Sequence, residues 1–106
     1  MLLEIKPLSV NEAWQGRRFK TRKYKKFEND LLLLLPKIET TDFSSIEITY
    51  GFSSKLADID NPTKLVIDIM QKRYGFNDKD ITRLVLNKVL TKKGSEFIDI
   101  SFPKAI

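Results

Sequence analysis

The chain has 106 residues, of which 42% are hydrophobic and 31% are charged, and its 19 basic and 14 acidic residues give a net charge of +5. This composition is typical of one globular domain spanning residues 1–106, and it excludes a disordered chain. The sequence contains neither cysteine nor histidine. Disulfides, thiol nucleophiles, serine triads with an imidazole base, cysteine-liganded zinc sites and histidine–metal sites are therefore excluded.

The longest uninterrupted apolar run, residues 31–35, is far shorter than the ~20 residues that cross a bilayer. Residues 1–6 lack the long apolar stretch of a signal peptide. We therefore expect a soluble protein that is not exported, works in the cytoplasm and has no membrane partner.

The first half of the chain predicts a short strand at residues 2–6, an irregular loop at 7–18, and a helix at 21–35 that Pro36 ends. Residues 45–52 alternate strictly between apolar and polar side chains, which predicts a strand. The apolar face of this strand carries Ile46, Ile48, Tyr50 and Phe52.

In the second half, Asn61 is a favoured N-cap and Pro62 a favoured first residue of a helix that extends to about residue 74. Gly75 is placed to end it. Two β-rich runs, 81–91 and 96–102, flank Lys92-Lys93-Gly94-Ser95, which is typical of a hairpin. The order β, α, β, α, β, β predicts an α+β domain with two helices packed on a small mixed sheet.

Positive charge is concentrated in one window, because seven of the ten residues from Arg17 to Lys26 are basic. The remaining residues include 12 basic and 14 acidic side chains. A basic window interleaved with Phe19 and Tyr24 indicates a surface that binds phosphates of a nucleic acid. A solvated, lysine-rich loop and helix start is the alternative interpretation. The basic residues are Arg17, Arg18, Lys20, Arg22, Lys23, Lys25 and Lys26.

The sharpest local signal is Asp58-Ile59-Asp60-Asn61, between the predicted strand and helix. In an extended segment Asp58 and Asp60 point the same way, and two such carboxylates attract a hard cation. Asp78 is a third candidate, although a helix of about 13 residues separates it from the pair by roughly 20 Å. Ordinary helix capping and a polar turn are the alternative for these acids. For Lys64 the alternative is a surface ion pair with Asp68.

These residues resemble the RusA-type crossover junction endodeoxyribonucleases, small Holliday-junction resolvases common in phages and prophages. Asp58-Ile59-Asp60-Asn61 followed by Lys64 and Asp68 is similar to the family's Asp-x-Asp-Asn-x-x-Lys-x-x-x-Asp signature. The opening Pro7-Leu8-Ser9-Val10-Asn11, with Trp14 and Gly16-Arg17-Arg18, resembles the family's opening. The segment 75–81 resembles its second motif, but reads Asn77-Asp78-Lys79-Asp80 where adjacent acids and a Gln are usual, so Asp80 competes with Asp78.

The resemblance implies a homodimeric, Mg²⁺-dependent nuclease, with Mn²⁺ as a substitute, that acts on branched DNA in recombination and repair and uses no small-molecule cofactor. Its catalytic residues would be Asp58, Asp60 and Asp78, which hold the metal, with Lys64 assisting. DNA would be bound by Asn11, Arg17, Arg18, Lys20, Arg22 and Lys23. A non-catalytic basic DNA-binding module is the alternative. Trp14, Leu32 and Leu33 are candidates for a dimer interface or for the core.

Overall fold

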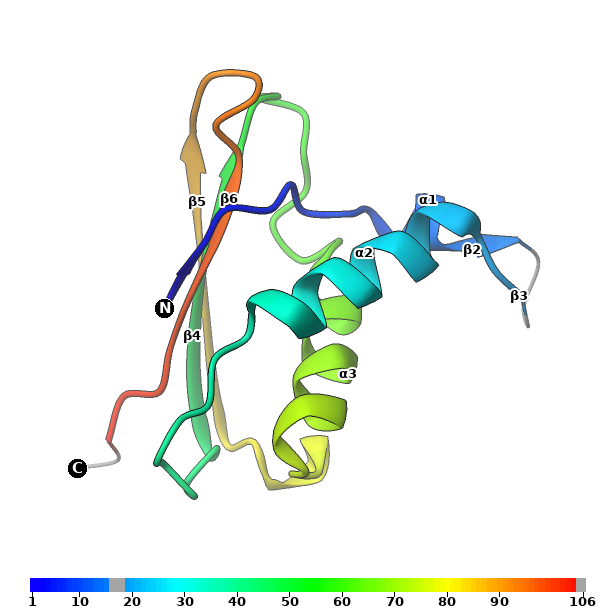
Figure 1. The fold of residues 1–106 in the computed structure, drawn as a ribbon. Helices are drawn as coiled ribbons and strands as arrows, with labels where there is room; N and C mark the ends of the chain where they lie inside the picture. Colours follow the sequence, from blue (N-terminus) through cyan, green and yellow to red (C-terminus); the bar gives the residue numbers. More distant parts are fainter. Residues whose placement is uncertain (16–18, 105–106) are drawn as a thin grey trace.

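A mixed four-stranded sheet with helices on one face forms the body of the molecule (Figure 1). The computed structural model describes residues 1–15 and 19–104. The arrangement confirms the predicted α+β class, with two long helices accompanied by two short ones. The elements are β1 (Leu2–Leu3), α1 (Val10–Ala13), β2 (Trp14–Gln15), β3 (Phe19–Lys20), α2 (Arg22–Leu34), β4 (Ser45–Phe52), α3 (Thr63–Tyr74), the 3₁₀ helix η1 (Asp78–Asp80), β5 (Arg83–Leu90) and β6 (Phe97–Ser101).

Strand β4 lies inside the sheet, whose order is β1-β6-β4-β5. It runs parallel to β5 and antiparallel to β6. The predicted hairpin at 92–95 is therefore wrong, because β5 and β6 are not neighbours and their connection crosses the end of β4. Both ends of that connection contact this end: Thr91 N–H donates to the Phe52 carbonyl, and Glu96 accepts from the Ser53 hydroxyl. The largely buried β4 takes the central place, where β6 and β5 flank it on both edges.

The N-terminal segment differs from its predicted strand and loop. The strand is confined to Leu2–Leu3, because the Ile5 N–H bonds back to the Leu3 carbonyl at 2.9 Å and turns the chain. The predicted loop contains α1 and β2. Ser9 caps α1, with its Oγ accepting from the Asn11 N–H at 3.2 Å, and Ala13 is fully buried.

The two long helices agree closely with their predicted ranges. Thr21 caps α2 by accepting from the Tyr24 N–H at 3.2 Å. At the end of α3, Gly75 adopts φ +76°, a left-handed conformation that glycine takes without strain. Asn61 does not cap α3, since the N-cap position is Pro62 and no side chain caps this end.

The core lies between the helices and the sheet face that carries the predicted apolar residues of β4. Ile46, Ile48 and Tyr50 are fully buried there. The Tyr50 hydroxyl contacts the Thr63 Oγ1 at 2.8 Å, which ties β4 to the start of α3. Figure 1 shows the opposite face of the sheet free of helices. No helix within the described ranges is long and apolar enough to span a membrane.

Candidate functional site

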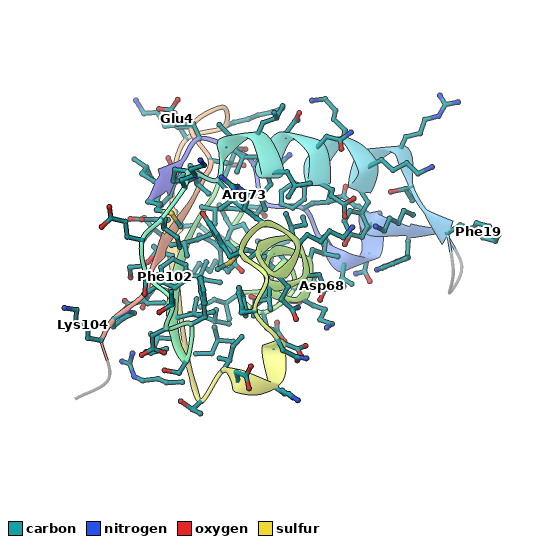
Figure 2. All side chains as sticks on the ribbon, turned by 60° about the horizontal axis from the view of Figure 1, so that its bottom comes forward. Glu4, Phe19, Asp68, Arg73, Phe102 and Lys104 are labelled. Atoms are coloured by element: carbon teal, nitrogen blue, oxygen red, sulfur yellow. The ribbon has the colours of Figure 1, made fainter. Side chains whose placement is uncertain are left out.

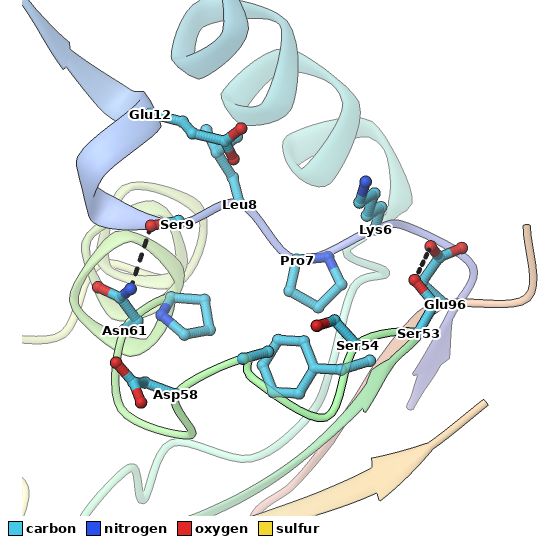
Figure 3. A pocket seen from close by; sticks show the side chains of 13 residues that line it. Lys6, Pro7, Leu8, Ser9, Glu12, Ser53, Ser54, Asp58, Asn61 and Glu96 are labelled. Carbon is cyan, nitrogen blue, oxygen red and sulfur yellow. Dashed lines mark hydrogen bonds between the residues drawn. The ribbon is translucent and has the colours of Figure 1, made fainter. Parts of the chain in front are cut away.

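Two of the predicted motifs, 52 residues apart in the sequence, meet beside the start of α3. The Asn61 side-chain amide donates to the Ser9 Oγ at 3.1 Å, as Figure 3 shows. A pocket of about 180 Å³ lies at this junction, and both motifs line it. Asn61 thus joins the opening segment to the acidic loop instead of capping the helix. The pocket is lined by Lys6, Pro7, Leu8, Ser9, Glu12, Phe52, Ser53, Ser54, Ala57, Asp58, Asn61, Pro62 and Glu96.

The acidic segment, residues 58–61, forms a turn and not the extended conformation that its sequence predicts. The Asn61 N–H bonds to the Asp58 carbonyl at 3.3 Å, and the Thr63 N–H bonds to the Asp60 carbonyl at 3.1 Å. The alternation argument for Asp58 and Asp60 therefore does not apply, because it holds only for extended backbone. Both side chains are exposed, and Asp58 lies at the pocket beside Asn61 (Figure 3).

Lys88 on β5 holds the loop that carries these acids. Its ammonium group donates to the carbonyls of Lys55, at 2.9 Å, and Ala57, at 2.5 Å. It also lies 5.8 Å from the centre of the Phe52 ring, within reach of a cation–π contact. The sequence contained a signal for this residue, because strand alternation places Lys88 on the apolar, helix-facing side of β5.

Asp78 lies beside α3 and close to Lys64, although a whole helix separates them in the sequence. The Asp78 N–H donates to the Gln71 side-chain carbonyl at 2.9 Å, so the chain after α3 folds back along the helix. The Lys64 ammonium then lies 3.6 Å from the Asp78 carboxylate and 3.0 Å from that of Asp68. The predicted Lys64–Asp68 ion pair is confirmed. Asp68 lies on the side of α3 away from the sheet (Figure 2).

The pKa of Lys64 is raised, first by the hydrogen bond to Asp68 and by the charge of that carboxylate, with a smaller contribution from Asp78. Its ammonium group therefore stays protonated well above neutral pH. A phosphate oxygen that contacts this ammonium group competes with the carboxylates of Asp68 and Asp78.

Across the described ranges, no three acidic side chains lie close enough together to hold one metal ion. The aspartates form two sets: Asp58 and Asp60 on the loop before α3, and Asp68 and Asp78 around Lys64. Mg²⁺ commonly binds one or two protein carboxylates and completes its shell with water and phosphate oxygens. The donor chemistry of Asp58 and Asp60 fits this ion, whereas the Lys64 ammonium group occupies the carboxylates of Asp68 and Asp78. Within residues 1–15 and 19–104, the predicted single site with three carboxylates is not formed.

Acidic residues outside the basic window neutralise several of its lysines. Glu28 accepts from Lys20 at 3.1 Å and from Lys72 of α3 at 2.9 Å. Lys23 pairs with Glu12 of α1 at 3.3 Å. Counting only the charges inside the window overestimates the free positive charge of this surface, because the acidic partners lie just outside the window in the chain.

The remaining predicted DNA-binding residues have different positions. Arg17 and Arg18 lie outside the described residues. Arg22 is exposed at the first turn of α2, and Asn11 is exposed on α1. Phe19, with 72% of its surface exposed, projects from β3 at the side of the molecule remote from the sheet (Figure 2).

No protein-family model matches the chain, and no curated protein matches it. The interpretation of this site therefore depends on its own residues and their arrangement.

Proposed function

We propose that this protein is a Mg²⁺-dependent, structure-specific endodeoxyribonuclease that resolves four-way DNA junctions by paired phosphodiester hydrolysis. The observation that supports it most is the meeting of the opening segment and the acidic loop through Ser9 and Asn61. Both segments belong to the resemblance with RusA-type resolvases.

In this proposal Asp58, Asp60 and Asp78 are the metal-binding carboxylates. Bound Mg²⁺, for which Mn²⁺ can substitute, supplies activation of water and neutralisation of phosphate charge. Lys64 contributes a fixed positive charge to the scissile phosphate or its leaving oxygen. Asp78 and Lys64 are already in contact at 3.6 Å, which supports their acting in one place. Asp80 remains the alternative third acid.

The phosphates of the junction arms are bound by Asn11 and the basic window, chiefly Arg17, Arg18, Lys20, Arg22 and Lys23. Phosphate contacts position DNA without reading its sequence, which suits recognition of a branched shape. The enzyme acts as a homodimer in the cytoplasm of a bacterial host cell, in recombination and repair, and is encoded by the chromosome or a phage.

The arrangement of the acids gives a specific reason to test the non-catalytic alternative. The three proposed ligands do not form one cluster in the described structure, and Asp78 is paired with Lys64. A basic DNA-binding module that uses its aspartates only for turns and ion pairs also has this geometry.

One assay distinguishes the junction-resolving nuclease from the non-catalytic DNA-binding module. A labelled synthetic four-way junction and a linear duplex of the same arm sequence are incubated with the protein in Mg²⁺, in Mn²⁺ and in EDTA. We expect incisions in the junction only, in either metal and not in EDTA. Binding of the junction without cleavage in any metal would establish the module. Equal cleavage of the linear duplex, RNA or flap substrates would indicate a nuclease of another specificity.

A further inference from the structure

The loop that carries Asp58 and Asp60 makes only long hydrogen bonds with itself. Among the described residues, the hydrogen bonds within segment 54–63 are 3.1 to 3.4 Å long, longer than the usual value of about 2.9 Å. The side chains of both aspartates are exposed, so packing does not hold them either. The position of this loop therefore depends on its contacts with other elements.

Lys88 makes the shortest of these contacts, and it does so from a rigid support. Its ammonium group donates to the Lys55 carbonyl at 2.9 Å and to the Ala57 carbonyl at 2.5 Å. Its backbone lies opposite Tyr50 of β4, which is fully buried. The ammonium group also lies beside the buried Phe52 ring of the same strand. Both ends of the Lys88 side chain are thus held against the central strand of the sheet.

Two contacts bracket the pair of aspartates along the chain. The Ala57 carbonyl, which Lys88 binds, directly precedes Asp58. The Asn61 amide, which is bound to the opening segment, directly follows Asp60. The turn between these two anchors is closed by one backbone hydrogen bond of 3.3 Å. The anchors therefore determine where both carboxylates lie relative to the sheet.

The ammonium group of Lys88 binds backbone carbonyls and leaves the acids alone. Within the described part of the chain, Lys88 forms no ion pair with Asp58, Asp60 or another carboxylate. An ion pair would occupy a carboxylate that a cation needs. Because Lys88 bonds to the carbonyls instead, it holds the loop and keeps both carboxylates available.

We infer that Lys88 is a positioning residue for the proposed metal site, and that it presets the arrangement of Asp58 and Asp60 through the loop backbone. This role rests on the metal-binding function proposed for the two aspartates. Groups that orient metal ligands typically contribute roughly 10- to 100-fold to metal affinity. Lys88 should therefore control the affinity for metal and leave the affinity for junction DNA in EDTA unchanged.

The first test measures metal binding without DNA and without cleavage. Lys88→Met keeps an unbranched apolar side chain beside Phe52 and removes the donors, whereas Lys88→Arg keeps both charge and donors. Mn²⁺ is titrated into each variant, and the free ion is followed by electron paramagnetic resonance. We expect Lys88→Met to raise the Mn²⁺ dissociation constant at least about tenfold and Lys88→Arg to recover part of the loss. Lys93→Met, in the exposed connection between β5 and β6, is the matched control and should bind Mn²⁺ as the wild type does.

Hydrogen exchange distinguishes positioning of the loop from support of the whole fold. Lys88→Met should speed the exchange of the amide protons of residues 55–61 and leave those in the middle of α3 protected. Faster exchange throughout α3 would show that Lys88 supports the whole fold, and it would overturn a role confined to the loop.

A double-variant cycle tests whether Lys88 acts through the aspartates. If it does, adding Lys88→Met to Asp58→Asn should cost much less Mn²⁺ affinity than adding it to the wild type. Equal losses in both backgrounds, or wild-type Mn²⁺ affinity in Lys88→Met itself, would overturn the inference and leave the proposed nuclease intact. Absence of Mn²⁺ binding by the wild-type protein would instead overturn the metal site of the proposed function, and the role of Lys88 with it.

Discussion

Asn61 and Lys64 show how single side chains organise the acidic region. Asn61 fastens the acidic loop to the opening segment through Ser9, while Lys64 binds Asp68 and Asp78 from two parts of the chain. The two exposed aspartates of the loop are left free of ion pairs within the described residues. Their carboxylates are therefore available for a cation.

We predict that Asp58→Asn and Asp60→Asn each lower junction cleavage more than about 100-fold, since even groups that only orient a metal ligand contribute 10- to 100-fold. Junction binding should be unchanged or tighter, because each variant removes a negative charge facing phosphate. Cleavage is followed by single-turnover kinetics, and binding by gel shift in EDTA. Exposed Glu39→Gln is the matched charge control and should cleave normally. Wild-type rates in both aspartate variants would rule out this metal site.

At the scale of elements, Glu28 links three of them. Its carboxylate accepts from Lys20 of β3 and Lys72 of α3 while it lies on α2. Burial raises the pKa of Glu28, but the hydrogen bonds from Lys72 and Lys20 outweigh that effect, and the pKa is lowered from its ordinary value of 4.5. The folded state therefore binds this proton less readily than the unfolded chain. The resulting stabilisation is complete above about pH 5 and is lost as the pH falls through the lowered pKa.

We predict that Glu28→Gln lowers the free energy of unfolding by about 1 kcal/mol at pH 7, with the difference from wild type shrinking towards pH 3. Urea unfolding followed by circular dichroism at several pH values measures it. Asp30→Asn breaks only the exposed pair with Lys26 on the same helix and should cost less than about 0.5 kcal/mol. A difference for Glu28→Gln that stays constant from pH 7 to pH 3 would contradict the linkage.

The basic window, which lies before and on α2, gives a second prediction at the scale of elements, on the binding of DNA. Neutralising Arg17, Arg18 and Lys20 together should weaken binding to all DNA and reduce the slope of log affinity against log salt by about 2.7, or 0.9 per phosphate contact. Neutralising Lys92 and Lys93, in the connection between β5 and β6, is the control and should leave the slope unchanged. An unchanged slope in the folded triple variant would mean that these side chains face solvent away from DNA.

At the scale of the whole molecule, the symmetry of the proposed substrate requires two equivalent sites. A four-way junction has approximate two-fold symmetry and must be cut in two strands, whereas one chain offers one acidic loop and one basic window. A two-fold dimer supplies two equivalent sites without a longer chain.

We predict symmetry-related nicks in two opposite strands of the junction, mapped on sequencing gels. Dimers assembled from one wild-type subunit and one Asp58→Asn subunit should nick a single strand, because each site cuts independently. Cleavage of both strands by such mixed dimers would contradict one site per subunit.

The pattern of neighbouring residues in the sequence was enough to predict β4, the two long helices and the end of α3 at Gly75. Alternation, helical spacing and the conformational freedom of glycine all act over a few residues. The pattern did not predict that β4 separates β5 from β6. A turn such as Lys92-Lys93-Gly94-Ser95 suits either a hairpin or a crossing connection, and the burial of β4 decides between them.

The sequence by itself also identified the acidic loop, Lys64 and its pair with Asp68, which lies one helical turn away. Only the tertiary structure brought Ser9 to Asn61, Asp78 to Lys64, and Lys88 to the loop carbonyls. Each of these contacts joins residues whose separation in the chain carries no periodic signal. They form because the packing of α3 on the sheet and the reversal after it place distant segments side by side, and hydrogen bonds then fix them.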